Sequence, residues 1–354
     1  MKFIADFHIH SKYSRATSKE MDVKNIARWA KLKGIQLMGT GDFTHHLWLE
    51  ELKTTLESLD NGLFIHDNIN FMLTSEISSI YSKRGKTYRI HNMVFAPNFK
   101  IVDKINNTLS NIGNLSSDGR PILGLDAEEL VRIVMDISDE CFVVPAHIWT
   151  PWFSAFGANS GFDSLEACFE KQVKHIYCLE TGLSSDPAMN WRLSKLDNYS
   201  LISNSDSHSP SRIGREANVF DCELSYADII NTLKAKDRRK FLSTIEFFPE
   251  EGKYHYDGHR NCKIRFTPEE SRQHNNICPQ CHKSLTIGVM NRVAQLADRP
   301  IGFVPENSIP FTNLIPLDEI IADAKGMASR TSKAVEREYS NIVGKFGTEL
   351  HVLL

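Results

Sequence analysis

The sequence lacks a long apolar run. No stretch of about 18 consecutive apolar residues occurs in its 354 positions, so no transmembrane helix is expected. The opening residues MKFIADFHIH place polar side chains inside the first apolar stretch, whereas a secretory signal peptide carries an uninterrupted apolar region there. We therefore expect a cytoplasmic protein with no membrane partner.

A strong excess of positive charge is also missing. The formal net charge is −3, which argues against bulk attraction to nucleic acid, although a net value can hide local patches. Residues 234–299 hold 13 Lys/Arg against 8 Asp/Glu. This basic stretch is interpreted either as a solvated helix end or as a contact with nucleic acid.

The cysteines are few and do not form an even set. There are seven, and an odd number without a signal peptide indicates a reducing compartment. Four of them stand in apolar surroundings and are interpreted as small core residues, namely Cys141, Cys168, Cys178 and Cys222. The other three fall between positions 262 and 281 and need a separate explanation.

The sequence does contain a regular alternation of strand-like and helix-like segments. Several short runs are apolar on both faces, as is typical of parallel strands covered on both sides. The segment 21–33 has helical spacing and ends at Gly34, a plausible C-cap; 126–137 and 187–196 are similar. The alternation predicts an α/β fold with a parallel sheet, and seven strands favour a closed or nearly closed barrel. The candidate strands are 3–9, 35–40, 71–76, 90–95, 141–147, 175–179 and 200–205.

Ionisable side chains gather at the ends of these candidate strands. In parallel barrels the C-terminal strand ends and the loops that follow them converge on the active site. One residue departs from this placement, because His91 opens its strand instead of ending it. The complete set is His8, His10, Asp42, Glu76, His91, His147, Asp206 and His208.

This set predicts a shared metal cluster. His8 and His10 alternate along a strand and so point to one side, and a carboxylate such as Glu76 can bridge two metals. A lone histidine at a strand end is more often a hydrogen-bonded surface or core residue, but burying all eight groups unpaired would be costly. Imidazole and carboxylate together suit Zn, Mn or Fe rather than Ca. Four further histidines lack this placement and are left out: His45, His46, His66 and His175.

A second metal site is predicted after the strands. His259-x2-Cys262 and Cys278-x2-Cys281 supply four ligands with 15 residues between the pairs, which is typical of a closed tetrahedral structural zinc site. The alternative is chance clustering of cysteines. Nearby histidines that could replace His259 are His255, His274 and His282. Basic residues of this module that could contact phosphates are Arg260, Lys263, Arg265 and Arg272.

The chain is expected to have three parts. Residues 98–121, rich in Asn, Ser and Gly, are predicted to be a loop. Residues 249–258 are a candidate boundary, and the pattern after Leu285 is mostly helical with a break around 300–316. We expect a barrel over 1–249, a zinc-binding module over 250–289 and a helical C-terminal segment over 290–354.

The ordered ligand-type residues resemble the PHP superfamily, named for its polymerase and histidinol phosphatase members. The likeness covers about residues 1–215 and rests on His8-Ile-His10, Asp42 after a strand, Glu76, His91, His147 and Asp206-Ser-His208. It implies a distorted seven-stranded (β/α) barrel with two or three divalent metals, such as Zn, Mn, Mg or Fe, in a phosphoesterase site.

A closer resemblance is to the endonuclease Q family of DNA-repair nucleases. The motifs that carry it are HSKYSRATSKEM from His10, GTGDFTH from Gly39, LETGLSSDP from Leu179 and NSDSHS from Asn204, and the zinc module and LTIGV from Leu285 continue it. The resemblance implies cleavage of DNA on the 5′ side of deaminated bases (hypoxanthine, uracil or xanthine) and at abasic sites. DNA would place the enzyme at the nucleoid; replication or repair proteins as partners cannot be identified from the sequence.

The resemblance also implies ligand sets. His8, His10, Glu76 and Asp206 would hold the first metal, and Glu76 would share the second with His91 and His147. Asp42 and His208 would belong to a third position. Two departures weaken the third position, since Phe43 follows Asp42 where many members have His, and Ala16 stands where some phosphatases place another His.

Residues beyond the ligands are assigned by position. Asp206, with His208 or His147 for proton transfer, is the expected catalytic group. Arg15, Lys12 and Arg212 could clamp phosphate or could serve the protein surface. A flipped base is stacked between aromatic side chains, and the aromatic loop after His147 could supply them or could pack onto the barrel. Its members are Trp149, Trp152, Phe153 and Phe156.

Two other functions remain open from the sequence. A PHP-type phosphatase acting on a small phosphomonoester would need neither the zinc module nor the C-terminal helices. A non-catalytic DNA-binding protein would not need the eight ligand-type residues. Both features therefore favour the endonuclease.

Overall fold

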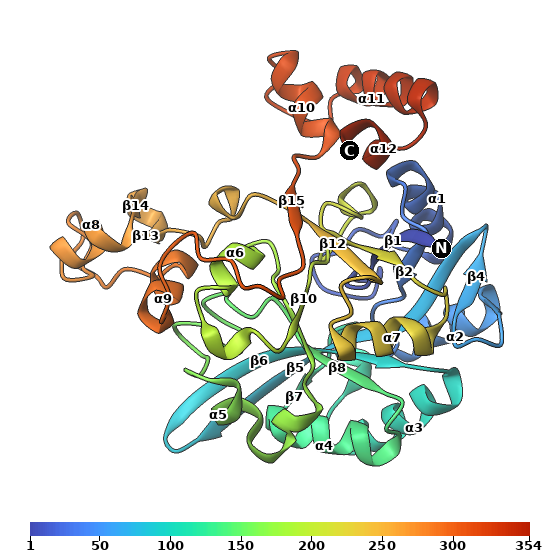
Figure 1. Cartoon of the computed structure of the whole chain (residues 1–354), viewed down its shortest axis with the longest axis horizontal. Coiled ribbons are helices and arrows are strands. Elements are labelled where there is room, and N and C mark those ends of the chain that lie inside the picture. The colour runs from blue at the N-terminus through green and yellow to red at the C-terminus, as the bar shows by residue number, and fades with distance from the viewer.

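One large sheet forms the centre of the protein, which we describe from a computed structural model of residues 1–354 (Figure 1). Its strand order is β15-β12-β11-β1-β2-β5-β4-β3, and β6, β7 and β8 join it through β5 and β6. The strands are β1 Lys2–Asp6, β2 Leu37–Gly39, β3 Glu57–Ser58, β4 Phe64–His66, β5 Ile69–Lys83, β6 Lys86–Ala96, β7 Ile122–Leu123, β8 Phe142–Pro145, β9 Cys178–Glu180, β10 Ser200–Ile202, β11 Ala217–Asp221, β12 Phe241–Glu246, β13 Asp257–His259, β14 Ile264–Phe266 and β15 Phe311–Asn313.

Helices cover the sheet and extend beyond it. The helix predicted over 21–33 is confirmed: the Asp22 carboxylate accepts from the Asn25 N–H at its start, and Gly34 closes it in the left-handed region at φ 90°. The helices are α1 Val23–Lys33, α2 His46–Thr55, α3 Phe99–Leu109, α4 Ala127–Ile137, α5 Leu165–Phe169, α6 Pro187–Asn190, α7 Tyr226–Ala235, α8 Pro268–Gln273, α9 Val289–Leu296, α10 Leu317–Ala324, α11 Lys333–Phe346 and α12 Glu349–Leu353.

The prediction of a parallel sheet is wrong at β6, and the β1–β11, β11–β12 and β4–β5 ladders are antiparallel as well. β1, β2 and β5 run parallel, but β6 pairs antiparallel with both β5 and β8. β5 and β6 form one long hairpin because Arg84 and Gly85 both adopt positive φ, the two-residue turn that matches the twist of the flanking strands. The fold is therefore mixed α/β.

The predicted barrel is not closed by hydrogen-bonded ladders. β8 reaches the β9–β10 pair through a single bridge between Val143 and Ile176, and the chain beyond β1 meets the chain beyond β10 through the bridge between Ile9 and Ser207. All seven candidate strand segments do contain a strand, from β1 to β10. The seven-stranded barrel itself stays a prediction.

The prediction of a loop over 98–121 is wrong, because α3 lies within it. Asn98 caps the helix by accepting from the Ile101 N–H, and Val102, Ile105 and Leu109 form its buried face. The Asn and Thr residues of this segment have low helix propensity, and burial of the apolar face overrides it. A smaller difference occurs at 187–196, where α6 ends at Asn190 and a short 3-10 helix, Ser194–Leu196, follows.

Alternate residues of the strands pack into two separate hydrophobic clusters. The inner cluster takes Met72 from β5 and Met93 from β6, while their neighbours Phe71 and Val94 belong to the outer cluster. Strand periodicity of two assigns each side chain to one face. The inner cluster also contains Phe3, Phe7, Leu37, Phe142, Val144, Cys178 and Ile202, so the strand segments predicted for the barrel share one core.

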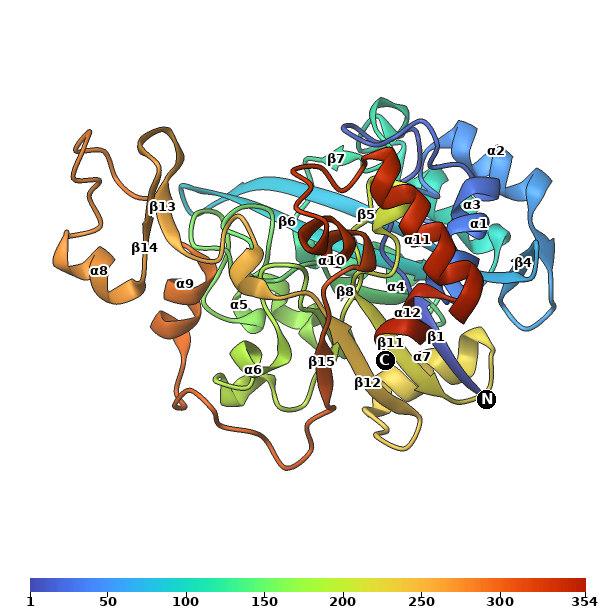
Figure 2. The ribbon, with the colours of Figure 1, turned by 90° about the horizontal axis from the view of Figure 1, so that it is seen from above.

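The C-terminal segment rejoins the sheet before its helices begin. β15 pairs parallel with β12, and α10 to α12 then pack beside α1 (Figures 1 and 2). A buried ion pair joins them, since Lys33 Nζ lies 2.5 Å from Glu349 Oε2 and both side chains are at most 5% exposed. Glu349 also accepts from the Leu317 N–H and the Tyr339 hydroxyl. No helix of the protein combines the length and apolarity that a membrane crossing demands.

We predict that Glu349→Gln loosens the C-terminal helices. Removing one partner leaves the Lys33 ammonium buried without compensation, which costs about 3–5 kcal/mol. Limited proteolysis followed by mass spectrometry should show cleavage in the α10–α12 region, together with a lower midpoint of thermal unfolding. Glu338→Gln removes the exposed partner of Lys325 and is the matched control, expected to change stability by less than about 1 kcal/mol. Equal behaviour of the two variants would contradict the prediction.

Candidate metal centre

Two extended segments bring four of the predicted residues together. After β1 the chain stays extended, and the His10 N–H donates to the Ser207 carbonyl at 2.9 Å. The bridge between Ile9 and Ser207 sets the register of this pairing. It places His8 and His10 against Asp206 and His208, although the two pairs are almost two hundred residues apart in the sequence.

Glu76 lies between two pairs of histidines. Its Oε2 is 3.2 Å from His10 Nε2 and 3.5 Å from His8 Nε2. Its Oε1 is 2.6 Å from His91 Nδ1 and 2.9 Å from His147 Nε2. Each oxygen of one carboxylate therefore faces a different imidazole pair.

The antiparallel direction of β6 explains the position of His91. His91 pairs with Ser78 across the β5–β6 hairpin, and Glu76 pairs with Met93. The start of β6 thus lies beside the far end of β5. His91 opens its strand and still reaches the same mouth as residues that end theirs.

Asp206 lies beside His8 and His10, and His208 lies at the rim of this group. Asp206 Oδ1 is 3.1 Å from His10 Nε2 and 3.7 Å from both His8 Nε2 and His208 Nδ1. Three sets of side chains have their ligand atoms within 4.8 Å of one another. They are His8, His10 and Glu76; His10, Asp206 and His208; and Glu76, His91 and His147.

Asp42 does not belong to any of these sets, although the resemblance implied that it would hold a third metal together with His208. Its Oδ1 lies 3.0 Å from His10 Nδ1, and its Oδ2 accepts from the Ser11 N–H, the Ser11 hydroxyl and the Ser14 hydroxyl. The carboxylate is thus fully engaged by protein groups. In this arrangement Asp42 holds the outer nitrogen of His10 and fixes the direction of the ring.

Glu180 plays the same part for His8 and was missed by the sequence reasoning. Its two oxygens lie 3.0 and 3.1 Å from His8 Nδ1. They also accept from the His147 N–H and the Asn204 side-chain amide. Carboxylates of this kind commonly orient metal-binding histidines. The available signal was its place at the end of a strand, inside the LETGLSSDP motif.

Buried atoms without hydrogen bonds show that the set fits divalent metals. His8 Nε2, His10 Nε2 and Asp206 Oδ1 are all buried and make no hydrogen bond of acceptable geometry, although they face each other. Unsatisfied buried polar atoms of this kind are costly and rare. Nitrogen and carboxylate ligands converging on common points are what zinc, manganese or iron require.

The electrostatics of the centre follow from burial and proximity. Burial lowers the pKa of His8, but the facing carboxylates of Glu180 and Glu76 outweigh burial and raise that pKa well above its usual range. Burial raises the pKa of Glu76, but His91 and Arg120 beside it hold that pKa well below its usual range. For His91 burial dominates and lowers the pKa to about 4, so its imidazole is charged only in acid, where its charge opposes protonation of Glu76. The carboxylates of Glu76 and Asp206 are thus kept ionised by the histidine and arginine side chains around them.

Three residues of the centre have strained backbone conformations. Asp42, His147 and Asp206 have φ angles of 50°, 30° and 46°, a region that non-glycine residues seldom adopt. Gly182 packs so closely on His147 that a Cβ there would lie 2.4 Å from the His147 Cβ. Such strain is typical of functional sites where surrounding packing fixes the conformation.

The aromatic loop divides into buried and accessible members. Trp149 and Phe156 are fully buried and pack on each other, so neither presents a face to a base; their assignment to a base pocket is corrected here. Phe153 is half-buried and its ring lies 4.8 Å from that of His91. Trp152 is half-buried beside Tyr254.

The predicted phosphate clamps differ in their surroundings. Lys12 is paired with Glu51 at 2.6 Å, and Arg212 is buried with Glu319 at 2.7 Å on the C-terminal helices. Arg15 is 76% exposed and touches Asp118. Arg120, which the sequence reasoning did not single out, donates to Glu76 at 3.1 Å.

The densest part of the basic stretch, residues 234–240, is largely paired on the surface. Lys240 contacts Asp228, Arg239 contacts Asp237, and Arg238 donates to the Glu306 carbonyl. These contacts favour the interpretation as a solvated helix end.

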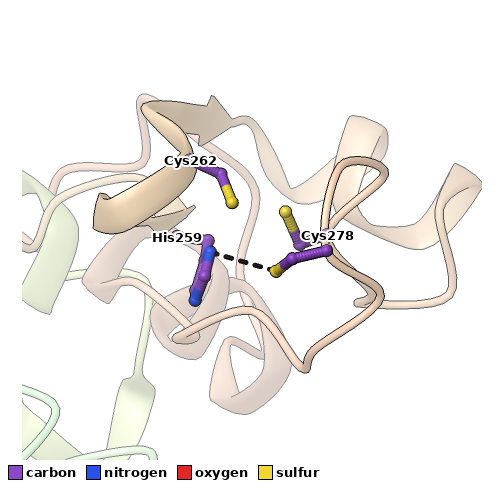
Figure 3. A group of neighbouring side chains, drawn as sticks. His259, Cys262 and Cys278 are labelled. Carbon is purple, nitrogen blue, oxygen red and sulfur yellow. Dashed lines mark hydrogen bonds between the residues drawn. The ribbon is translucent and has the colours of Figure 1, made fainter.

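The four predicted zinc ligands lie together in a small module at one end of the molecule. The β13–β14 hairpin and α8 project away from the C-terminal helices (Figure 2). Figure 3 shows the cysteine sulfurs turned toward one another and toward the His259 ring, whose Nδ1 is 3.4 Å from Cys281 Sγ. Burial raises the pKa of Cys278, but the backbone N–H groups of Cys281 and Gln280 outweigh burial and lower it. A thiolate is the form that binds metal.

Relatives in sequence match most of this chain. It is 34% identical over 211 residues to uncharacterized protein MJ0043 of Methanocaldococcus jannaschii, covering 58% of this chain and only 26% of that protein. It is 29% identical over 372 residues to uncharacterized protein YqxK of Bacillus subtilis, covering 99% of this chain and 88% of that protein. The family described as MJ0043 C-terminal domain matches residues 316–354.

Two solved structures match nearly the whole chain. The lesion-specific endonuclease PfuEndoQ from Pyrococcus furiosus is 32% identical with a TM-score of 0.88, covering 99% of this chain and 85% of that one. Endonuclease Q in complex with a 27-mer duplex substrate, with an abasic lesion at the active site, is 32% identical with a TM-score of 0.89, covering 99% and 86%.

The fold and the arrangement of imidazole and carboxylate groups define the class: a mixed α/β protein with a candidate divalent-metal centre. Within that class, the chain belongs to the endonuclease Q family. Its class of enzyme is accordingly that of the metal-dependent endodeoxyribonucleases.

We predict that Glu180→Gln weakens metal binding without unfolding the protein. The amide keeps the shape but loses the charge that holds His8, and loss of such an orienting partner typically costs about 10- to 100-fold in affinity. Isothermal titration of the metal-free protein with Mn²⁺ measures the change. Glu166→Gln, on the exposed side of α5, is the control. Unchanged Mn²⁺ affinity of Glu180→Gln would show that Glu180 has no role in orienting His8.

Proposed function

We propose that this protein is a DNA-repair endonuclease that hydrolyses the phosphodiester bond 5′ to deaminated bases and at abasic sites. Hypoxanthine, uracil and xanthine are the bases in question. The observation that carries the proposal is the paired histidine sets around Glu76 in a chain that aligns almost throughout with endonuclease Q. The relative bound to duplex DNA with an abasic lesion at its active site supports the substrate class.

The proposed ligand sets follow the groups of neighbouring side chains, with Asp206 added to the first because it faces His10 and His8. His8, His10, Glu76 and Asp206 would hold one divalent ion, and Glu76, His91 and His147 a second. His208, with His10 and Asp206, is the remaining group and would serve a third position. When bound, such ions polarise phosphoryl oxygens and lower the pKa of a coordinated water. Zn, Mn, Mg or Fe are the candidates.

Asp206, His147 and His208 are the proposed catalytic residues. Hydrolysis requires a group that removes a proton from the attacking water and one that returns a proton to the departing oxygen. The side chains of Asp206 and His208 are 27% and 31% exposed, so both reach the mouth of the centre. Burial lowers the pKa of His208, and His10 beside it lowers that pKa further, which leaves a neutral imidazole able to accept a proton.

A damaged base has to leave the helix before it can be inspected, and this costs a few kcal/mol. The Phe153 ring lies 4.8 Å from that of His91, and Trp152 of the same loop lies beside Tyr254. We assign the stacking surface to Phe153 and Trp152. Arg15, exposed beside Asp118, remains a candidate phosphate contact.

The seven strands that share the inner cluster are proposed to form one distorted barrel. The proposed division of the chain is a barrel over 1–249, a zinc module over 250–289 and a helical segment over 290–354. DNA as substrate and seven unpaired cysteines suit the cytoplasm, with association at the nucleoid.

We predict that the protein cuts a labelled duplex carrying one deoxyinosine when Mn²⁺ or Mg²⁺ is supplied. Asp206→Asn should reduce the cleavage rate by about 10²–10⁴-fold. The substitution neutralises a carboxylate that is proposed both to bind a metal ion and to accept a proton from the attacking water. Denaturing gel electrophoresis measures the cut. Asp136→Asn on the exposed face of α4 is the matched control.

Undamaged duplex and p-nitrophenyl phosphate complete that experiment. Release of phosphate from p-nitrophenyl phosphate with no incision of any duplex would select the small-molecule phosphatase instead. Binding without either reaction would select a non-catalytic DNA-binding protein. In a fluorescence-anisotropy titration of the same two duplexes, Phe153→Ala should weaken binding to the deoxyinosine duplex more than to the undamaged one; an equal effect on both would remove Phe153 from the base pocket.

We also propose that His259, Cys262, Cys278 and Cys281 hold one structural zinc. Cys278→Ser should lower the zinc content by one ion per chain, as measured by elemental analysis. It should also lower the midpoint of unfolding of the module, because a closed zinc site contributes directly to folding. Cys168→Ser, a buried core cysteine outside the module, is the control and should leave the zinc content unchanged. A full complement of zinc in Cys278→Ser would contradict the assignment.

A further inference from the structure

A short segment between α3 and β7 lies against the metal centre. Residues 118–121, called the strap below, are held at both ends by the protein. The Gly119 N–H donates to the Tyr13 carbonyl at 3.1 Å, and the Ser78 N–H donates to the Pro121 carbonyl at 3.0 Å. The strap therefore connects the loop after His10 to β5, the strand that carries Glu76.

The strap approaches the centre as closely as its atoms allow. A Cβ added to Gly119 would lie 2.3 Å from Asp42 Oδ2 and 2.4 Å from Ser14 Oγ. The Asp118 carboxylate turns back and accepts from the Arg120 N–H. Glycine at 119 lets the backbone press against Asp42, and Asp118 sets the conformation of the next residue.

This geometry delivers the Arg120 side chain to the centre. Its Nη1 donates to Glu76 Oε2 at 3.1 Å, the oxygen that also faces His8 and His10. Nη1 makes the only side-chain hydrogen bond that Arg120 has. One quarter of the side chain is exposed, and none of its remaining N–H donors is buried without a partner.

Arg120 differs from the other candidate phosphate contacts because its partner, Glu76, is a candidate metal ligand. Lys12, Arg15 and Arg212 contact carboxylates outside the ligand sets, whereas Arg120 contacts a carboxylate that belongs to two of them. An ion bound by His8, His10 and Glu76 would compete with Arg120 for that oxygen. The guanidinium then has donors to offer to another anion at the same place.

We infer that Arg120 binds the scissile phosphate of the DNA. A guanidinium carries five N–H donors in a planar fork that matches phosphate oxygens, and such charge-assisted contacts are strong. The strap makes the position rigid, which reduces the entropy lost on binding. The inference deepens the proposed endonuclease function and rests on it.

The test compares two lesion duplexes that differ by one charge. Both carry deoxyinosine, and one replaces the phosphodiester on its 5′ side with a neutral methylphosphonate. Fluorescence anisotropy in Ca²⁺ gives the dissociation constants for the unmodified protein, Arg120→Ala, Arg120→Lys and the surface control Arg132→Ala. Elemental analysis after loading with Mn²⁺ gives the metal content of each.

Arg120→Ala should weaken binding of the phosphodiester duplex by about tenfold and leave binding of the methylphosphonate duplex unchanged. Arg120→Lys should be intermediate, because it keeps the charge but loses the fork, and metal content should be equal throughout. Equal losses on both duplexes, no loss on either, or a lower metal content in Arg120→Ala would each overturn the inference and leave Arg120 as a partner that positions Glu76.

A failure of the proposed endonuclease function gives a different result from a failure of the Arg120 assignment. If the unmodified protein neither binds nor cuts the deoxyinosine duplex, the proposed function fails. Titration with inorganic phosphate then tests the anion site by itself: weaker phosphate binding by Arg120→Ala than by Arg132→Ala supports it, and equal binding overturns it.

Discussion

The metal centre depends on one carboxylate shared between two pairs of imidazoles. Glu76 is buried on β5, and each of its oxygens faces a different histidine pair. The position is possible because β5 pairs with β2 on one side and with β6 on the other. β2 leads to β1 and so to His8 and His10, while β6 supplies His91 directly. Moving Glu76 by one residue would turn its side chain to the opposite face of the strand.

A second layer of carboxylates keeps the imidazoles in place. Asp42 holds the outer nitrogen of His10, and Glu180 holds that of His8. Each carboxylate is itself fixed by backbone or side-chain donors, so the ring directions are set before any ligand arrives. Burying these charges is costly: burial alone shifts the pKa values of His8 and Glu76 toward their neutral forms. Neighbouring groups of opposite charge reverse both shifts. Preorganisation of this kind is what metal-assisted hydrolysis requires.

The sequence allowed the strand segments and the residues of the centre to be predicted because both follow local rules. Apolar runs identify buried strands, and ligand-type residues at their ends point to one mouth. The direction of β6 could not be predicted in this way, since it depends on a turn at Arg84 and Gly85, which lie between the separately predicted strands 71–76 and 90–95. α3 was missed because its Asn-rich composition resembles a loop, and only tertiary packing reveals the buried face of Val102 and Ile105. Glu180 and Arg120 were missed for a different reason: each acts through a contact with a residue far away in the sequence.

An ion held by His8, His10 and Glu76 would compete with Arg120 for Glu76 Oε2, and this competition would link the strap to the state of the centre. Without ions, the guanidinium neutralises part of the carboxylate charge that would otherwise repel within a buried space. With ions in place, their positive charge takes over that task, and repulsion from the ions favours a guanidinium that faces outward to an anion. The same residue would therefore offset the charge of Glu76 in the metal-free centre and would be available to phosphate once ions are bound. A lysine would serve the first task but not the second equally well, because it has no planar fork.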